Sequence, residues 1–170
     1  VSCAEVLKDS LLRVMPDSNV TIITDLPQKL NGFANDWQVY DASPYEYTIK
    51  LEADMIVPTS IEHWWDVLKD RDIVVSSTIR NYKGEISNVR AYRKFIDDNN
   101  LPDIYQGLMY FRYSQTASMF FLTAQRIYRN WEYLKNNVLK NCREETPSTD
   151  VLYALAAQVI GIENCTLPSL

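Results

Sequence analysis

The 170-residue sequence is poor in several residue types on which common kinds of active site depend. It has four glycines, and neither common type of glycine-rich phosphate loop is present. Its single histidine, His63, lies beside Trp64 and Trp65, where we expect a packed or surface side chain, so Ser-His-Asp and Cys-His hydrolase sites are not indicated. The three cysteines are too few and too widely spaced for a disulfide framework or a zinc site. This cysteine usage fits a reducing cytoplasm best.

Charge and hydropathy exclude further classes. The formal net charge is −5, the sequence pI is near 4.9, and no cluster of five or more Lys and Arg residues occurs, so we expect no direct nucleic-acid footprint. The apolar runs are far shorter than the roughly 18 to 20 residues of a membrane helix, so we expect no membrane span. The length suits one globular domain rather than two.

The most informative stretch is 48–58, in which two carboxylates follow an apolar, strand-like run. In an extended chain Glu52 and Asp54 point to the same face, because successive side chains alternate. Mg²⁺ is usually held by one or two carboxylates, with water and substrate phosphate completing its shell, and Mn²⁺ also favours oxygen ligands. We therefore predict a site for Mn²⁺ or Mg²⁺ at Glu52 and Asp54. The alternative is a half-buried strand whose acidic residues only face water.

Three segments, taken in order, resemble landmarks of the GT-A nucleotide-sugar glycosyltransferases. Segment 43–58 is similar to their Asp-x-Asp region, with Glu52 in place of the first acid and an intact Asp54 at the last. Segment 101–112 is similar to the stretch that passes beneath the donor sugar, although the usual Asn-Ser before the glycine is replaced. Segment 147–155 is similar to the helix start that supplies an acid near the acceptor. The resemblance spans residues 10–160.

The resemblance implies a single α/β domain, GT-A-like (Rossmann-like), with a mostly parallel sheet and helices on both faces. It implies a metal-dependent glycosyltransferase of the hexosyltransferase type that takes a UDP- or GDP-linked sugar and transfers it to an acceptor that the residues do not identify. In that family a strand precedes the first helix. Because this chain begins inside a helical pattern, the resemblance implies that part of the N-terminal nucleotide-binding strand is lacking.

The resemblance and the residue types also suggest further site residues. Gln106 and Gly107 would lie beneath the sugar, since glycine permits a close backbone approach. Asp25 ends a predicted strand on the nucleotide side. Arg80 is the candidate for neutralising the diphosphate, because charge stabilisation is the main contribution of such a site. Arg80 belongs to the polar segment 77–100, which carries further basic residues, among them Arg90 and Arg93. The alternative is that this segment is only a solvated surface with scattered charge.

Asp150 is the candidate acid or base for an acceptor hydroxyl, because a carboxylate there can accept the proton. The alternative is a helix N-terminal acid that offsets the helix macrodipole, with Ser148 as the cap.

Periodicity predicts alternating helices and strands along the chain. Such alternation favours a mostly parallel sheet covered on both faces, with ligands at the carboxyl ends of the strands. The predicted helices are 6–14, which Pro16 ends, 61–68 and one long helix over 117–134, and the predicted strands are 20–25, 37–40, 47–51 and 73–76.

Two other functional classes remain open. A sugar nucleotidyltransferase uses a related sheet and an acidic metal pair, but it normally carries a glycine-rich signature near its amino end, and this sequence has none. A catalytically silent GT-A-like binding module is favoured by Glu52 and by the replaced Asn-Ser. Donor hydrolysis in the presence of metal separates an enzyme from a silent module.

Overall fold

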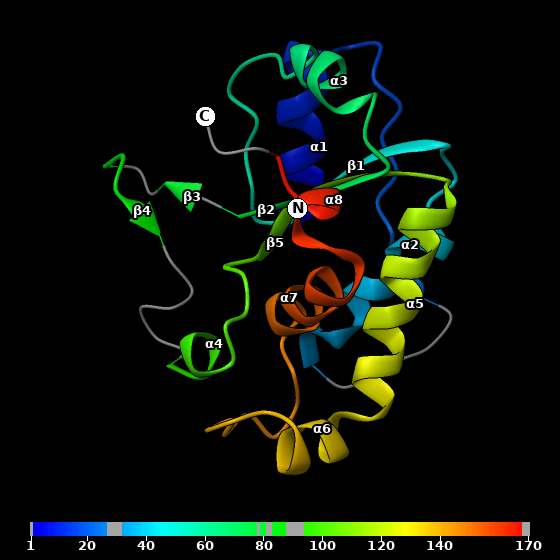
Figure 1. Cartoon of the computed structure of the whole chain (residues 1–170). Helices are drawn as coiled ribbons and strands as arrows, with labels where there is room; N and C mark the ends of the chain where they lie inside the picture. The colour runs from blue at the N-terminus through cyan, green and yellow to red at the C-terminus, as the bar shows by residue number, and fades with distance from the viewer. Residues whose placement is uncertain (1, 27–31, 78, 81–82, 88–93, 168–170) are drawn as a thin grey trace.

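The computed structural model describes residues 2–26, 32–77, 79–80, 83–87 and 94–167. The described elements are a 3-10 helix, short helices and short strands, with three longer helices among them (Figure 1). In chain order they are α1 (Cys3–Val14), η1 (Gly32–Gln38), α2 (Val39–Ala42), β1 (Tyr47–Leu51), α3 (His63–Leu68), β2 (Ile73–Ser76), β3 (Ile79–Arg80), β4 (Ile86–Ser87), α4 (Lys94–Asp98), β5 (Tyr105–Arg112), α5 (Gln115–Arg129), α6 (Trp131–Asn137), α7 (Thr149–Ile160) and α8 (Ile162–Cys165).

The main sheet is small and antiparallel, so the prediction of a mostly parallel, Rossmann-like GT-A sheet is wrong. Its strand order is β1-β5-β2, and β5 pairs antiparallel with both neighbours. Tyr47 of β1 lies opposite Arg112, and Ile73 of β2 lies opposite Phe111. The alternation of helices and strands does not say which strand is central. The longest strand, β5, takes the centre and runs against the other two.

Several local predictions are confirmed. Helix α1 begins at a capping box in which the Ser2 side chain accepts from the backbone of Glu5 and the Glu5 side chain accepts from the backbone of Ser2. It ends just before Pro16, as the sequence predicts. Strands β1 and β2 have the predicted bounds, and α3 lies within its predicted range. Local signals were sufficient for these elements.

Two predicted strands are wrong. Residues 18–26 form neither helix nor strand, because a β-branched composition yields a strand only where a partner pairs with it. The predicted strand 37–40 is helical, spanning the end of η1 and the start of α2. There Trp37 and Val39 are buried, and the Tyr40 ring stacks on that of Phe121 with a centroid distance of 5.1 Å. Burial of this aromatic segment against α5 overrides its strand-like composition.

The predicted long helix over 117–134 is two helices, α5 and α6. Asn130 ends the first and begins the second, with φ −108° and ψ 18°. Its side-chain nitrogen donates to the carbonyl of Arg126 at 2.8 Å. Asparagine competes for backbone hydrogen bonds in this way, which favours a helix end. The apolar stripe nevertheless continues across the break, since Ile127 and Trp131 are both buried.

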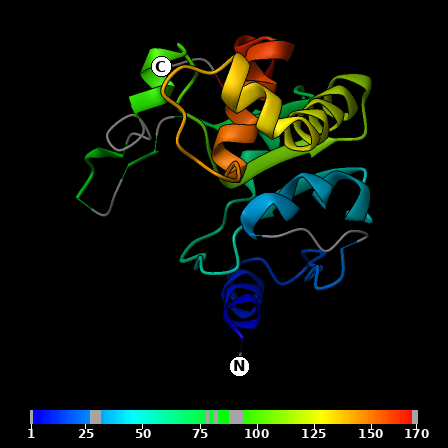
Figure 2. The same ribbon diagram turned by 90° about the horizontal axis from the view of Figure 1, so that it is seen from below.

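The two faces of the sheet carry separate apolar clusters. Met109 and Phe111 of β5 belong to the larger cluster, which includes residues of α5 and α7. Tyr110, on the opposite face of β5, packs with Val74 and with Trp65 of α3. Helix α1 lies on the other side of the molecule from α5 and α7 (Figure 2). Strands β3 and β4 pair with each other and project to one side (Figure 1).

Asp72 joins the start of β2 to the end of β5 and to the beginning of α5. The Arg112 side chain donates to its carboxylate at 2.8 Å. A hydrogen bond from Thr116 lowers the pKa of the Asp72 carboxyl below its ordinary value of 3.8, and hydrogen bonds from Arg112 and Ser114 act in the same direction. A carboxylate with a depressed pKa in the folded state adds stability above the pKa of the unfolded chain, and that stability is lost as the pH falls through the folded pKa.

We predict that Asp72→Asn lowers the free energy of unfolding by about 1 kcal/mol at pH 7, because it weakens charge-assisted hydrogen bonds at a partly exposed position. The difference between wild type and variant should shrink as the pH falls below the ordinary value of 3.8. Urea unfolding of wild type and variant at several pH values measures the difference in the free energy of unfolding and its dependence on pH. Asp66→Asn removes an exposed ion pair with Lys69 and should cost much less. Equal losses of stability in Asp72→Asn and Asp66→Asn would contradict the role given to the hydrogen bonds of Asp72.

Candidate functional site

Gln106, near the start of β5, is the point at which three distant segments meet. Its side-chain nitrogen donates to Oε1 of Glu52, just beyond the end of β1. Its backbone N–H donates to Oδ1 of Asp150, on the first turn of α7, at 3.0 Å. The backbone N–H of Glu52 in turn donates to the carbonyl of Gly107 at 3.1 Å. The three segments that resemble glycosyltransferase landmarks therefore come together in space.

Lys50 adds a cation to this cluster. Its Nζ donates to Oε1 and, at 3.2 Å, to the backbone carbonyl of Gln106. It also forms an ion pair with Oδ2 of Asp36, on η1, at 2.7 Å. The Lys50 side chain is only 12% exposed. We use the name Gln106 cluster for the group formed by Asp36, Lys50, Glu52, Gln106 and Asp150.

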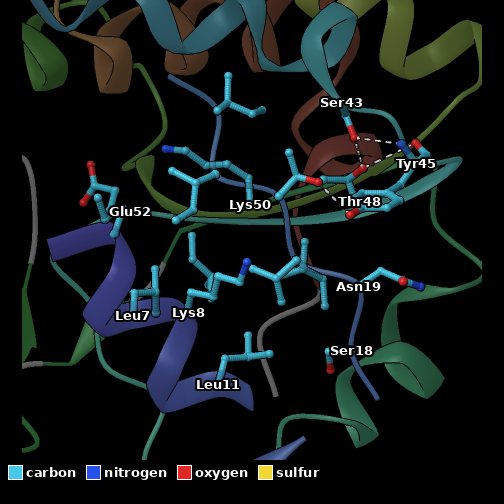
Figure 3. A pocket seen from close by; sticks show the side chains of 18 of the residues that line it. Leu7, Lys8, Leu11, Ser18, Asn19, Ser43, Tyr45, Thr48, Lys50 and Glu52 are labelled. Carbon is cyan, nitrogen blue, oxygen red and sulfur yellow. Dashed lines mark hydrogen bonds between the residues drawn. The ribbon is translucent and has the colours of Figure 1, made fainter. Parts of the chain in front are cut away.

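A cavity of about 1000 Å³ lies between α1 and β1 and reaches the Gln106 cluster (Figure 3). Leu7, Lys8 and Leu11 line it from α1, facing Lys50 and Glu52 across the space. Residues 18–23 and the 43–45 turn line its other end. The cavity thus has a largely apolar body with a charged end, which is the usual character of a site for a small organic ligand.

Burial alters the acidity of Glu52. It raises the pKa of the Glu52 carboxyl above its ordinary value. The positive charge of Lys50 and the hydrogen bond from Gln106 lower that pKa, while the negative charges of Asp54 and Asp36 raise it. A further cation bound beside Glu52 would therefore lower this pKa and favour the ionised carboxylate.

Glu52 and Asp54 line the same cavity, but they are not placed as an extended strand would place them. Strand β1 ends at Leu51, and residues 52–55 form a turn in which the Met55 N–H donates to the Glu52 carbonyl at 3.2 Å. Asp54 is exposed at this turn. Within the described ranges no group of three or more His, Cys, Asp or Glu side chains is arranged to hold a metal ion. A metal here would need oxygen ligands from a substrate or water.

Gly107 lies against the site residues. A Cβ atom at this position would come 2.4 Å from Cε1 of Tyr105 and 3.0 Å from Oε2 of Glu52. These distances are too short for a side chain without movement of its neighbours. The absence of a side chain at Gly107 is therefore what lets the Glu52 carboxylate lie over the start of β5.

Asp150 is the second residue of α7, and the Ser148 side chain caps the helix by accepting from the Val151 N–H. This matches the predicted helix start. With Oδ1 bound to the backbone of Gln106, Asp150 fixes the entry into β5. Its carboxylate also lies at the helix N-terminus, where negative charge is favourable.

Two predicted donor residues lie apart from this cluster. Asp25 is exposed and is not among the described residues that line the cavity. Arg80 is on β3, where its guanidinium donates to the carbonyl of Gly84 at 2.8 Å, and it does not line the cavity either. Arg90 and Arg93 of the same polar segment lie outside the described residues.

Lys50 and Asp36 are residues of the Gln106 cluster that the sequence reasoning missed, and Lys8 lines the cavity outside that cluster. Lys50 stands between Ile49 and Leu51 in the apolar run of β1, and an isolated lysine in such a run is a usable signal for a paired or functional cation. Nothing comparable marks Asp36 or Lys8. Their places in the site depend on where η1 and α1 lie relative to β1.

No family model matches the chain, and neither a curated protein nor a solved structure matches it. The resemblance to glycosyltransferases therefore rests on the sequence motifs alone. None of the described helices has the length and apolar character needed to cross a bilayer.

We predict that Gly107→Ala displaces the Glu52 carboxylate, because the new methyl group would overlap its present position and that of the Tyr105 ring. The displaced atoms are the ends of side chains, so the loss of stability should be modest, about 1 kcal/mol. Where Mn²⁺ binds at Glu52, as the sequence predicts, the variant should bind it more weakly than its loss of stability explains. Thermal melting and Mn²⁺ titration of wild type and variant measure the two effects.

Gly84→Ala is the comparison, since Gly84 has φ +79° and no atom within 4 Å of an added Cβ. It should lower stability through backbone strain and leave Mn²⁺ binding unchanged. Unchanged Mn²⁺ binding in folded Gly107→Ala would contradict the prediction that the Glu52 carboxylate holds the metal.

Proposed function

We propose that the protein is a metal-dependent glycosyltransferase that takes a sugar from a UDP- or GDP-linked donor. The observation that carries the proposal is the convergence of Glu52, Gln106 and Asp150, of which Glu52 and Gln106 line the charged end of a cavity and Asp150 lies behind Gln106. These residues come from three separate segments, each of which resembles a landmark of the same family. The proposal depends on this convergence and does not require a parallel sheet.

The residues at the charged end fit a hard divalent cation. Glu52 and Asp54 supply carboxylate oxygens on one cavity, and one or two carboxylates with substrate phosphate are a usual ligand set for Mg²⁺. The same oxygen donors suit Mn²⁺. When bound, such a cation would stabilise the negative charge of the leaving diphosphate. Gln106 supports this arrangement by holding the Glu52 carboxylate in place.

The body of the cavity suits the nucleoside part of the donor. Its volume, about 1000 Å³, is at the upper end of the range for small-ligand sites. Leu7, Leu11 and Ile49 offer apolar surface, while Asn19 and Thr21 offer polar atoms at the far end. A donor lying along β1 would place its diphosphate near Glu52 and its base toward Tyr45.

Asp150 remains the candidate acid or base for the acceptor hydroxyl, with Gln106 and Gly107 beneath the sugar. Of these three, Gln106 lines the cavity, and Asp150 and Gly107 contact the lining residues Gln106 and Glu52. The bond of Asp150 to the Gln106 backbone supports the alternative that it positions β5. Asp25 and Arg80 have no part in the proposed donor site, because neither lines the cavity. The acceptor is not specified by these residues.

The proposal places the protein in a reducing compartment such as the cytoplasm. Cys3, Cys142 and Cys165 are all free, and burial raises the pKa of the Cys165 thiol to about 12. A thiol of this kind is unreactive at neutral pH.

We predict that UDP or GDP binds this chain more tightly with Mn²⁺ than without it, as measured by calorimetry. Asp54→Asn should remove most of the metal-dependent gain, because the exposed carboxylate at the turn is lost as a ligand. Asp70→Asn removes an exposed carboxylate just after α3 and should bind like the wild type.

The reaction itself is tested by metal-dependent hydrolysis of UDP-glucose or GDP-mannose. Metal-dependent nucleotide binding without hydrolysis of any donor in a sugar panel would support a catalytically silent module. Formation of a nucleotide sugar from sugar phosphate and nucleoside triphosphate would instead identify a nucleotidyltransferase. No nucleotide binding by the folded wild type, with or without Mn²⁺, would overturn the proposal.

A further inference from the structure

We infer that Lys50 is a positioning residue that fixes the Gln106 side chain and, through it, the Glu52 carboxylate of the proposed metal site. This inference rests on the proposed function. The relevant observation is a continuous chain of contacts from Asp36 through Lys50 and Gln106 to Glu52. Lys50 has no direct role in the resemblance to glycosyltransferases.

The chemistry of the two neighbours determines how the Gln106 amide is turned. The Lys50 ammonium only donates hydrogen bonds, so the group facing it must be the amide oxygen. The ionised Glu52 carboxylate only accepts, so the group facing it must be the amide nitrogen. A single amide orientation satisfies both neighbours. Lys50 therefore selects the orientation in which Gln106 donates to Glu52.

Lys50 is itself held firmly. Its three contacts go to Asp36 Oδ2, the Gln106 carbonyl and Gln106 Oε1, which matches the three protons of an ammonium group. The side chain is 12% exposed, whereas that of Asp36 is 32% exposed. The backbone of Gln106 is fixed separately by Asp150, so rotation of its side-chain amide is the freedom that Lys50 removes.

Two effects of Lys50 on a nearby divalent cation have opposite signs. As a positive charge it repels the cation, so its removal would strengthen binding. As a positioning residue it holds a metal ligand in place through Gln106, and loss of such a supporting contact typically weakens metal binding by about 10- to 100-fold. The sign of the change in Mn²⁺ affinity therefore separates the two roles.

The experiment compares Lys50→Met, Lys50→Arg and Lys8→Met with the wild type. Lys8 lines the same cavity from α1, so Lys8→Met removes an equal charge and serves as the matched control. Electron paramagnetic resonance of free Mn²⁺ gives the affinity for the metal alone. Thermal melting verifies that each variant is folded. In a ¹⁵N-¹H spectrum the Gln106 side-chain NH₂ signals, identified by their loss in Gln106→Glu, report on the amide without any metal.

We expect Lys50→Met to bind Mn²⁺ about tenfold more weakly and to shift the Gln106 NH₂ signals toward those of a solvent-exposed amide. Lys50→Arg, which keeps the charge and donors, should recover part of the affinity. Lys8→Met should leave the NH₂ signals unchanged and bind Mn²⁺ as tightly as the wild type or more tightly.

Each contrary result has a distinct meaning. Gln106 NH₂ signals that are unchanged in folded Lys50→Met would overturn the inference, whatever the metal does. Tighter Mn²⁺ binding in Lys50→Met would also overturn it, since Lys50 would then act through its charge. If the wild type binds no Mn²⁺ even with UDP present, the proposed function fails, and this role of Lys50 fails with it.

Discussion

The antiparallel pairing of β5 with both β1 and β2 is the constraint on which the other parts of the molecule depend. Its backbone is paired along both edges, and both of its faces are covered. Met109 and Phe111 are fully buried on the face toward α5 and α7, while Tyr110 is buried on the face toward α3. A shift of one residue would reverse every side chain, which would place the tyrosine hydroxyl in the larger apolar cluster. Burial thus fixes the register of β5 on both sides.

The same register determines the geometry of the Gln106 cluster. Leu51, the last residue of β1, lies opposite Leu108, so the next residue along the chain comes beside Gly107. The hydrogen bond from the Glu52 N–H to the Gly107 carbonyl continues the pairing one step past the end of the strand. The placement of a carboxylate at the cavity is therefore a consequence of apolar packing several residues away. Stability of the sheet and precision of the site have a common physical origin here.

Sequence reasoning succeeded where the signal is local. The cap at Ser148, the breaker at Pro16 and the apolar run of β1 act within a few residues, and the elements that they predict are present. Strand pairing is not local, so the parallel sheet and the strand 20–25 were wrong. The same contrast between local and non-local signals applies to the site residues. Glu52, Gln106 and Asp150 were chosen from separate motifs and do meet, whereas Asp25, taken from the end of a predicted strand, and Arg80, chosen for its charge, do not join them. The isolated lysine in β1 was a usable local signal, but its partners come from η1 and β5, which no local pattern connects to β1.

The energetics of the Gln106 cluster favour a role in binding over a role in stability. The largely buried ammonium of Lys50 and the half-buried carboxylate of Glu52 have lost much of their hydration. The attraction between buried opposite charges usually does no more than offset that cost. Replacing a buried ion pair by apolar residues of similar volume is often neutral or stabilising. The cluster instead keeps alternating donors and acceptors in one fixed order, from Asp36 through Lys50 and Gln106 to Glu52. Such an order constrains the direction of every polar group, and it ends on a carboxylate that lines the cavity. In the proposed function the ionic groups therefore contribute the orientation of the Glu52 carboxylate.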